Sequence, residues 1–219
     1  MKIGILGTGV VGETIGSALI NKDHQVLMGS RKAGNDKAKT WVKRAGKSAS
    51  EGTFSDAALF GEVIFLCPNG GYALDALDTV KRDDINGKIL IDLTNPLDFT
   101  QGMPPFILHE YHDRSLGEKI QEMVPNAYVV KTLNTVNCNV MVEPRKINNG
   151  NHSLFICGDD ANAKNQVMHF LVDNFGWLPE SFIDLGDIRA ARVTEAYVPL
   201  WAMMYQALGT PAFSIKVVR

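Results

Sequence analysis

Short apolar runs alternate with stretches of helical periodicity along the first 134 residues. The runs that read as strands are 2–6, 25–28, 62–67, 88–93 and 128–133. The stretches that read as helices are 11–21, 33–50, 55–59, 72–80 and 116–123. Strands that are apolar almost throughout are typical of a parallel sheet whose two faces are both covered by helices.

The pattern changes after residue 150. Strands are expected at 153–157 and 181–185, with a helix between them that Asp159 or Asp160 caps. A long apolar stretch at 188–208 reads as a helix that must be buried, either against its own sheet or against another subunit. We therefore predict an α/β fold with a Rossmann-type doubly wound parallel sheet in residues 1–150 and a small C-terminal α/β portion, residues 151–219, packed on it.

A glycine-rich loop, Gly7-Thr8-Gly9-Val10-Val11-Gly12, follows the first strand and opens the first helix. In this context the spacing predicts a dinucleotide site, because Gly7 permits the tight turn, Gly9 lets the backbone approach a pyrophosphate, and Gly12 lets the helix pack on the strand. The free N–H groups and the partial positive charge of the helix N-terminus favour the bound anion.

The end of the second strand indicates which dinucleotide is bound. An NAD site has an acidic residue there that accepts hydrogen bonds from the ribose hydroxyls, whereas this chain has Ser30, Arg31 and Lys32. Arg31 can hold a 2′-phosphate through a bidentate, charge-assisted contact, Ser30 can donate its hydroxyl, and Lys32 adds positive potential. The sequence therefore predicts NADP(H) rather than NAD(H).

Composition narrows the possible partners. A net charge of −2 over 219 residues gives no broad basic field, so we expect no nucleic acid partner. No apolar run approaches the ~20 residues that span a bilayer, and no signal segment precedes the first strand, so we expect a cytoplasmic protein without a membrane partner. The three separated cysteines, Cys67, Cys138 and Cys157, suggest neither disulfides nor a zinc site and read as small packing residues.

Several further motifs extend over nearly the whole chain. They are Gly29-Ser30-Arg31, Asn95-Pro96-Leu97-Asp98-Phe99, Lys131-Thr132-Leu133-Asn134-Thr135-Val136, Cys157-Gly158-Asp159-Asp160, Asp184-Leu185-Gly186-Asp187, Leu208-Gly209-Thr210-Pro211 and Ser214-Ile215-Lys216-Val217-Val218. With the glycine loop, they make the chain resemble the NADP-dependent oxidoreductases of the deazaflavin (coenzyme F420) family, and its bacterial members in particular.

This resemblance implies an enzyme that passes hydride between NADP(H) and a flat acceptor held over the nicotinamide. It also implies site residues. The segment Cys67-Pro68-Asn69 would lie against the cofactor, and the turns Thr94-Asn95-Pro96 and Asn134-Thr135 would line the nicotinamide pocket. The acceptor would contact Val136, Asn137, Leu208 and Gly209, with the C-terminal portion completing its cleft. The turns follow strands, where ligands of parallel sheets bind.

The acceptor itself stays open at this stage. The loop 100–115 is longer than its counterpart in the archaeal enzymes and lies where an acceptor should approach. A deazaflavin or a flavin is expected, with a quinone or a small imine or carbonyl compound as alternatives. A non-catalytic NADPH sensor is the alternative from another functional class. The apolar helix 188–208 favours a homodimer, because tyrosine and tryptophan are typical of interfaces.

Three other polar features have plainer interpretations. His109 and His112 could share a metal, but no third ligand is indicated and a polar loop is the simpler interpretation. Glu195 lies in the apolar helix and could relay a proton if it were buried, although Arg192, three residues earlier, could pair with it. Because the cofactor carries the hydride chemistry, no residue is named as catalytic and no metal is expected.

Overall fold

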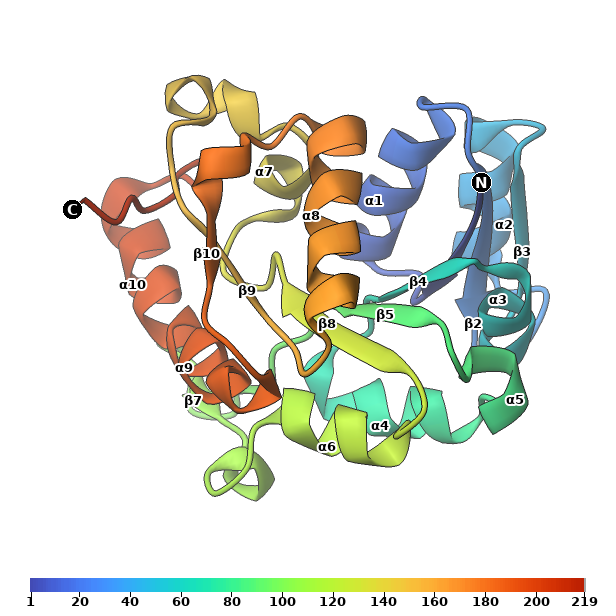
Figure 1. The fold of residues 1–219 in the computed structure, drawn as a ribbon, viewed down its shortest axis with the longest axis horizontal. Helices are drawn as coiled ribbons and strands as arrows, with labels where there is room; N and C mark the ends of the chain where they lie inside the picture. The colour runs from blue at the N-terminus through green and yellow to red at the C-terminus, as the bar shows by residue number, and fades with distance from the viewer. Residues whose placement is uncertain (219) are drawn as a thin grey trace.

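The structure is a computed structural model that describes residues 1–218, so Arg219, the last residue of the C-terminal portion, lies outside the described residues. A single eight-stranded sheet runs through the molecule in the order β10-β9-β8-β5-β4-β1-β2-β3 (Figure 1). Its strands are β1 (Lys2–Leu6), β2 (Gln25–Ser30), β3 (Ala49–Thr53), β4 (Val63–Leu66), β5 (Ile89–Asp92), β8 (Tyr128–Thr132), β9 (Leu154–Cys157) and β10 (Phe182–Asp184). This confirms the Rossmann-type α/β fold.

Helices cover both faces of the sheet, as Figure 1 shows. One layer contains α1 (Val10–Ile20), α2 (Asp36–Ala45), α7 (Cys138–Val142) and α8 (Ala161–Phe175). The other layer contains α3 (Phe54–Phe60), α4 (Ala73–Asp78), α5 (Arg82–Ile85), α6 (Leu116–Met123) and α9 (Ala191–Ala196). The helix α10 (Val198–Leu208) continues from α9 along one end of the sheet.

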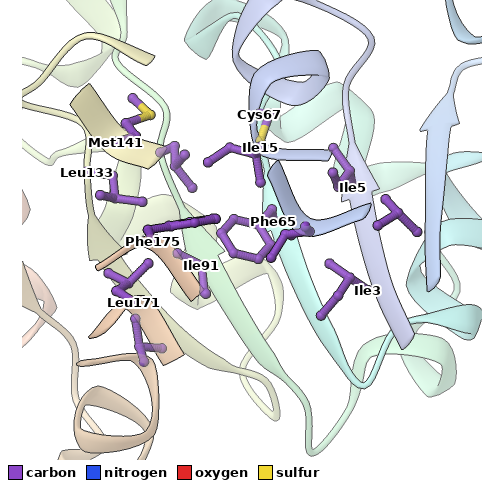
Figure 2. Close-up of a cluster of buried hydrophobic side chains, with 14 of the residues drawn as sticks. Ile3, Ile5, Ile15, Phe65, Cys67, Ile91, Leu133, Met141, Leu171 and Phe175 are labelled. Atoms are coloured by element: carbon purple, nitrogen blue, oxygen red, sulfur yellow. The ribbon is translucent and has the colours of Figure 1, made fainter. Parts of the chain in front are cut away.

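Each layer encloses its own hydrophobic core. On the α1 and α8 side, Ile5, Ile15, Phe65 and Phe175 are buried together, and Figure 2 shows their side chains meeting between the sheet and the helices. On the other side the core is built on residues such as Leu66, which packs with the inner faces of α3, α4 and α6. The apolar strands are thus buried on both faces, as their sequence predicted.

Two expected elements differ from the structure. The helix expected at 33–50 ends at Ala45, and β3 follows as the outermost strand of the sheet. Its sequence, Ala-Ser-Glu-Gly-Thr, has little strand propensity, and pairing with β2 overrides that preference. The helix expected at 188–208 is divided into α9 and α10 around Tyr197. Pro199 lies in the first turn of α10, where its missing N–H cannot serve the carbonyl of Glu195.

The last two strands extend the same sheet rather than forming a second one. β9 runs antiparallel to β8 over the register pairs Lys131↔Cys157 and Thr132↔Ile156, and β10 runs parallel to β9. The sheet is therefore mixed, with one antiparallel pair. Among the described residues, each helix is too short or too polar to cross a membrane.

The apolar stretch that forms α9 and α10 is buried on one side. Val198 and Ala202 are buried, whereas Leu200 and Leu208 are 57% and 58% exposed. Trp201 lies between these extremes and stacks on Phe213 of the C-terminal tail at 5.4 Å between ring centroids. Within one chain, then, α10 has a buried side and an apolar side that faces outward.

Candidate functional site

The glycine loop has the strand-loop-helix geometry that its spacing predicted. β1 ends at Leu6, α1 begins at Val10, and Gly7 between them has a φ of 132°. A Cβ on Gly12 would lie 2.3 Å from the carbonyl oxygen of Gly7, so only glycine allows the helix to approach the loop this closely. A Cβ on Gly9 would meet nothing within 4 Å.

The N-terminus of α1 is open. Gly9 is its N-cap residue and offers no side-chain hydrogen bond, so the first-turn N–H groups are free of a capping side chain. These groups, the helix dipole and the space above Gly9 together make a place that fits a phosphate anion.

A pocket of about 420 Å³ opens beside this loop. It brings together eight residues that the sequence had singled out: Gly7, Thr8, Gly9, Ser30, Arg31, Cys67, Pro68 and Asn69. They come from the ends of β1, β2 and β4, which are neighbours in the sheet. Val10, Val11 and Gly12 form the first turn of α1, directly after the loop.

Arg31 lines this pocket, with its guanidinium 5.1 Å from the ring centroid of Tyr72. The hydroxyl of Ser30 is buried and donates to the carbonyl of Lys32 at 2.7 Å, which fixes the turn after β2. Lys32 itself is exposed and does not line the pocket. Of the two cations in this turn, Arg31 lines the pocket and Lys32 does not.

The turns after β5 and β8 lie side by side and are joined by their asparagines. Asn95 Nδ2 donates to the carbonyl oxygen of Asn134 at 2.8 Å, and Asn134 Nδ2 donates to Asn95 Oδ1 at 2.9 Å. Thr94, Pro96, Thr135 and Val136 are buried around this pair. Asn137 accepts a hydrogen bond from the backbone N–H of Asn139 and thereby caps the N-terminus of α7.

Beneath these turns lies a buried ionic cluster that the sequence analysis did not anticipate. The ammonium of Lys131 is 2.7 Å from Asp92 Oδ2, 2.8 Å from the carbonyl oxygen of Thr94 and 2.9 Å from Glu195 Oε1. We call these four residues the Lys131 network. Desolvation lowers the pKa of Lys131, but the two carboxylates raise it more, so the pKa lies above its usual value and the side chain is charged.

Glu195 is buried, as the proton-relay interpretation required, but its partners differ from the expected one. Its two carboxylate oxygens accept hydrogen bonds from the backbone N–H groups of Leu116 and Gly117 at the N-terminus of α6. Arg192 turns away and forms two hydrogen bonds with Glu118, at 2.9 and 2.6 Å. The expected pair of Arg192 with Glu195 was therefore wrong.

Glu118, in the first turn of α6, accepts hydrogen bonds from Arg192 and from the hydroxyl of Ser115. Hydrogen bonding to Arg192 and, more weakly, to Ser115 outweighs the cost of burial and lowers the pKa of Glu118 to about 2. The same carboxylate forms a capping box with Ser115.

A second pocket, of about 430 Å³, lies between the loop that follows the Thr94-Asn95-Pro96 turn and the α9–α10 junction. The loop folds as a small hairpin of β6 (Leu97–Asp98) and β7 (Phe106–Ile107). The pocket is lined mainly by apolar groups, including Pro104, Phe106, Ile107, Tyr111, Ala196 and Pro199, with Arg192 and Glu195 among its polar residues. Its walls come from the loop 100–115 that the sequence placed near the acceptor.

Leu208 and Gly209 lie elsewhere in the chain. The helix α10 runs from its junction with α9 toward the C-terminal tail (Figure 1). Leu208 is its last residue, Gly209 follows it, and both are exposed. Neither residue lines the pocket beside the glycine loop or the pocket at the hairpin. The expected acceptor contacts from Leu208 and Gly209 are thus not made within these two pockets.

Sequence analysis missed several residues that shape these pockets. Asn35, Lys37 and Tyr72 line the first one without belonging to a motif. A signal did exist for the Lys131 network, because Asp92 and Lys131 are charged residues inside two strands that are otherwise buried. They are direct register partners in neighbouring strands, and buried charges of opposite sign require a partner.

Comparison with known proteins gives consistent relatives. A family model described as "NADP oxidoreductase coenzyme F420-dependent" matches residues 2–96. The F420-dependent NADP reductase of Methanocaldococcus jannaschii is 30% identical and aligns over 96% of both chains. A crystal structure of a candidate F420-dependent NADP reductase from Arthrobacter sp. FB24 has 39% identity, a TM-score of 0.91 and full coverage of both chains.

A reductive aminase from Aspergillus terreus, solved with NADPH and ethyl levulinate, is a more distant structural match. Its TM-score is 0.66 at 17% identity, and the alignment covers 95% of this chain but 62% of the aminase. At that identity the match shows a shared fold.

Proposed function

Since this chain belongs to the family of coenzyme F420-dependent NADP oxidoreductases, and is therefore an NADP-dependent oxidoreductase, we propose that it transfers hydride between NADP(H) and a deazaflavin or flavin-like acceptor. The observation that carries the proposal is a single pocket lined both by the glycine loop, which precedes an uncapped helix N-terminus, and by Arg31.

The residues of this pocket fit NADP(H). The α1 N-terminus and the open space above Gly9 suit the pyrophosphate. Arg31 suits the 2′-phosphate, with its guanidinium presented over the ring of Tyr72. Lys37, on the same pocket wall, adds a second cation that the motif analysis did not include. When bound, the reduced nicotinamide supplies the hydride.

The turns after β4, β5 and β8 would hold the nicotinamide end. Cys67, Pro68 and Asn69, which follow β4, line the same pocket as the glycine loop and Arg31. The Asn95–Asn134 pair fixes the next two turns relative to each other, and the ligand sites of parallel sheets lie at these strand ends. The work of the protein is then to orient two rings and to exclude water, because hydride transfer depends on their relative placement.

The pocket at the hairpin is our candidate for the acceptor side. Its apolar lining, with Tyr111 and Pro199, suits the face of a flat ring better than a small polar substrate. It follows directly from the Thr94-Asn95-Pro96 turn, since Leu108 at the end of the hairpin donates to the carbonyl of Pro96 at 2.8 Å. Flatness and an apolar face are properties that deazaflavins and flavins share.

A test compares acceptors directly. Purified protein is incubated with NADPH and, in separate assays, with coenzyme F420, FMN, FAD, a soluble quinone, and a small imine or ketone, and NADPH oxidation is followed by absorbance. We expect turnover with the deazaflavin or a flavin. Turnover restricted to the imine or ketone would refute the proposed acceptor class, and NADPH binding without turnover on any acceptor would indicate a sensor.

A homodimer is part of this proposal. The helix α10 carries four exposed residues with large apolar or aromatic side chains, Leu200, Met203, Tyr205 and Leu208. Pairing two copies through these side chains would bury them. The same pairing would bring Leu208 and Gly209 of one copy toward the partner, which is the arrangement that would let them reach an acceptor.

A further inference from the structure

The Lys131 network lies under the proposed nicotinamide turns, yet it does not line the pocket that suits the phosphates of the cofactor. Lys131 is 1% exposed and sits near the end of β8, opposite Asp92 at the end of β5. An ammonium has three N–H donors, and here they face three acceptors, on Asp92, Thr94 and Glu195.

The three acceptors belong to three different parts of the site. Asp92 ends a strand, Thr94 begins the turn that we propose for the nicotinamide, and Glu195 lies on α9, whose residues line the pocket at the hairpin. Asp92 also accepts hydrogen bonds from the backbone N–H and the hydroxyl of Thr94, at 2.8 and 2.6 Å. Thr94 is therefore held at both of its backbone polar groups, with its N–H bound to Asp92 and its carbonyl oxygen bound to Lys131.

The other end of the network is equally constrained. Glu195 shares its two oxygens between Lys131 and the N–H groups of Leu116 and Gly117. One residue earlier, the carbonyl of Thr194 accepts a hydrogen bond from Asn134 at 3.2 Å. Two successive residues of α9 are thus linked to the two turns. Glu195 is linked to the Thr94 turn through the ammonium of Lys131, and Thr194 is linked to the turn after β8 through the amide of Asn134.

Stability alone does not account for this arrangement. Replacing a buried ionic cluster by packed apolar residues is often neutral or stabilising, so a gain in folding free energy is a weak explanation for buried charges at this place. The cluster does fix the relative positions of its members, because each N–H of Lys131 binds one acceptor atom.

We propose that Lys131 is a positioning residue for hydride transfer: it locks the Thr94 turn to α9, so that the nicotinamide side and the acceptor side of the site keep one fixed relation. The inference rests on the proposed function and adds a named residue to it. Lys131 acts through Thr94 and Glu195, and it contacts neither ring.

The test compares two buried lysines. Lys131→Met removes the ammonium and keeps most of the side-chain length. Lys164→Met is the matched control, because Lys164 is also buried and binds one carboxylate, Asp184, at 2.8 Å and one carbonyl, that of Gly186, at 2.9 Å. Its partners lie at and after the end of β10, an edge strand that four other strands separate from β1 and the glycine loop.

Hydride transfer is measured in a single turnover with NADPH and with 4-deuterated NADPH, using the acceptor found active. For Lys131→Met we expect the transfer rate to fall by at least about tenfold with a larger isotope effect, because a misplacement of about 1 Å can cost a hundredfold. The dissociation constant of NADPH should stay within about twofold of wild type, since the phosphate contacts are untouched. Lys164→Met should keep the wild-type rate.

A second readout does not require an acceptor. The fluorescence lifetime of bound NADPH reports how firmly its nicotinamide is held, and we expect a shorter, heterogeneous decay in Lys131→Met but not in Lys164→Met. If no acceptor is active, the proposed function fails while this readout still decides the positioning role. If Lys131→Met does not fold, Glu195→Gln tests the same link and should show the same changes at smaller size.

The proposal is overturned if Lys131→Met, or Glu195→Gln in its place, transfers hydride at the wild-type rate with the wild-type lifetime. It is overturned equally if Lys164→Met loses as much rate as Lys131→Met, because removal of any buried lysine ammonium from the sheet would then be enough to cause the loss.

Discussion

Asn95 and Asn134 are 39 residues apart in sequence and bind each other at the strand ends, each donating through its side-chain amide to an oxygen of the other. The pair joins the turn after β5 to the turn after β8. Because Asn134 also donates to the carbonyl of Thr194, the link continues into α9.

The first prediction concerns this link. Asn134→Ala should lower the free energy of unfolding by about 1–3 kcal/mol, since it leaves Asn95 Oδ1 and the Thr194 carbonyl without their donor in a buried place. Urea denaturation measures the loss. Asn139→Ala, at an exposed position of α7, is the control and should change little. Equal stability of the two variants would contradict the structural role of the pair.

The second prediction concerns cofactor choice. Arg31→Ala should weaken NADPH binding by about 2–3 kcal/mol, because a hydrogen bond to a charged group contributes about 1.5–3 kcal/mol. NADH binding should barely change. Titration of cofactor fluorescence gives both affinities, and Arg44→Ala, which removes an exposed pair with Glu13, controls for the loss of a surface cation. A similar loss of affinity for NADPH and NADH would show that Arg31 does not bind the 2′-phosphate.

The third prediction separates two glycines of one loop. Gly9→Val adds a side chain where nothing lies within 4 Å, so the protein should fold and yet bind neither NADPH nor NADH. Gly12→Val should instead impair folding, because its Cβ would meet the Gly7 carbonyl oxygen at 2.3 Å. Thermal melts and cofactor titrations distinguish the two. Normal affinity in folded Gly9→Val would mean that the phosphates bind elsewhere.

The fourth prediction concerns the stability of the folded protein at acidic pH. The pKa of Glu118 is lowered in the folded protein to about 2 from its usual 4.5, so its charged form stabilises the fold above pH 4.5. That contribution, on the order of 1–3 kcal/mol given that Arg192 is half exposed, should be lost as the pH falls from about 4.5 toward 2. Glu118→Gln should therefore be less stable than wild type at pH 7, with the difference narrowing in acid. A difference independent of pH would contradict it.

The fifth prediction concerns assembly. If α10 forms the dimer interface, Leu200→Glu should give monomers that retain their fold, because Leu200 is largely exposed within one chain. Light scattering and circular dichroism measure mass and fold. Val193→Glu, a change at an exposed apolar residue on α9, tests whether the interface extends beyond α10. Wild-type protein with the mass of one chain at micromolar concentration would refute the dimer.

Much of the fold could be predicted from sequence because the signals are local. The glycine loop needs only six consecutive residues, and apolar strands such as 128–133 are visible as runs. Asp160 caps α8 by accepting from the backbone of Ala163, as a helix-start signal predicts, and Asp159 instead accepts from Ile188. These features depend on neighbours in the chain.

Features set by distant partners could not be predicted in the same way. β3 exists because β2 offers an edge, and its own residues indicate a helix end or a loop. The apolar pattern also does not encode the direction of β9, which pairs antiparallel with β8. Glu195 could equally pair with Arg192 by spacing, and the choice of Lys131 instead depends on β8 lying beneath α9.

The short ladder between β8 and β9 has a dynamic consequence. Only two register pairs join the last two strands to the rest of the sheet, whereas β1 and β2 share five. Side chains therefore hold this segment to the nucleotide half, since Phe175 of α8 packs in the same core as Ile5 and Glu195 binds Lys131, and the backbone pairing of β9 is the part able to open locally. Amide protons of β9 and β10 should accordingly exchange with deuterated solvent faster than those of β1 and β4. NADPH bound at the proposed glycine-loop site should slow exchange in β1 and β4 more than in β9 and β10.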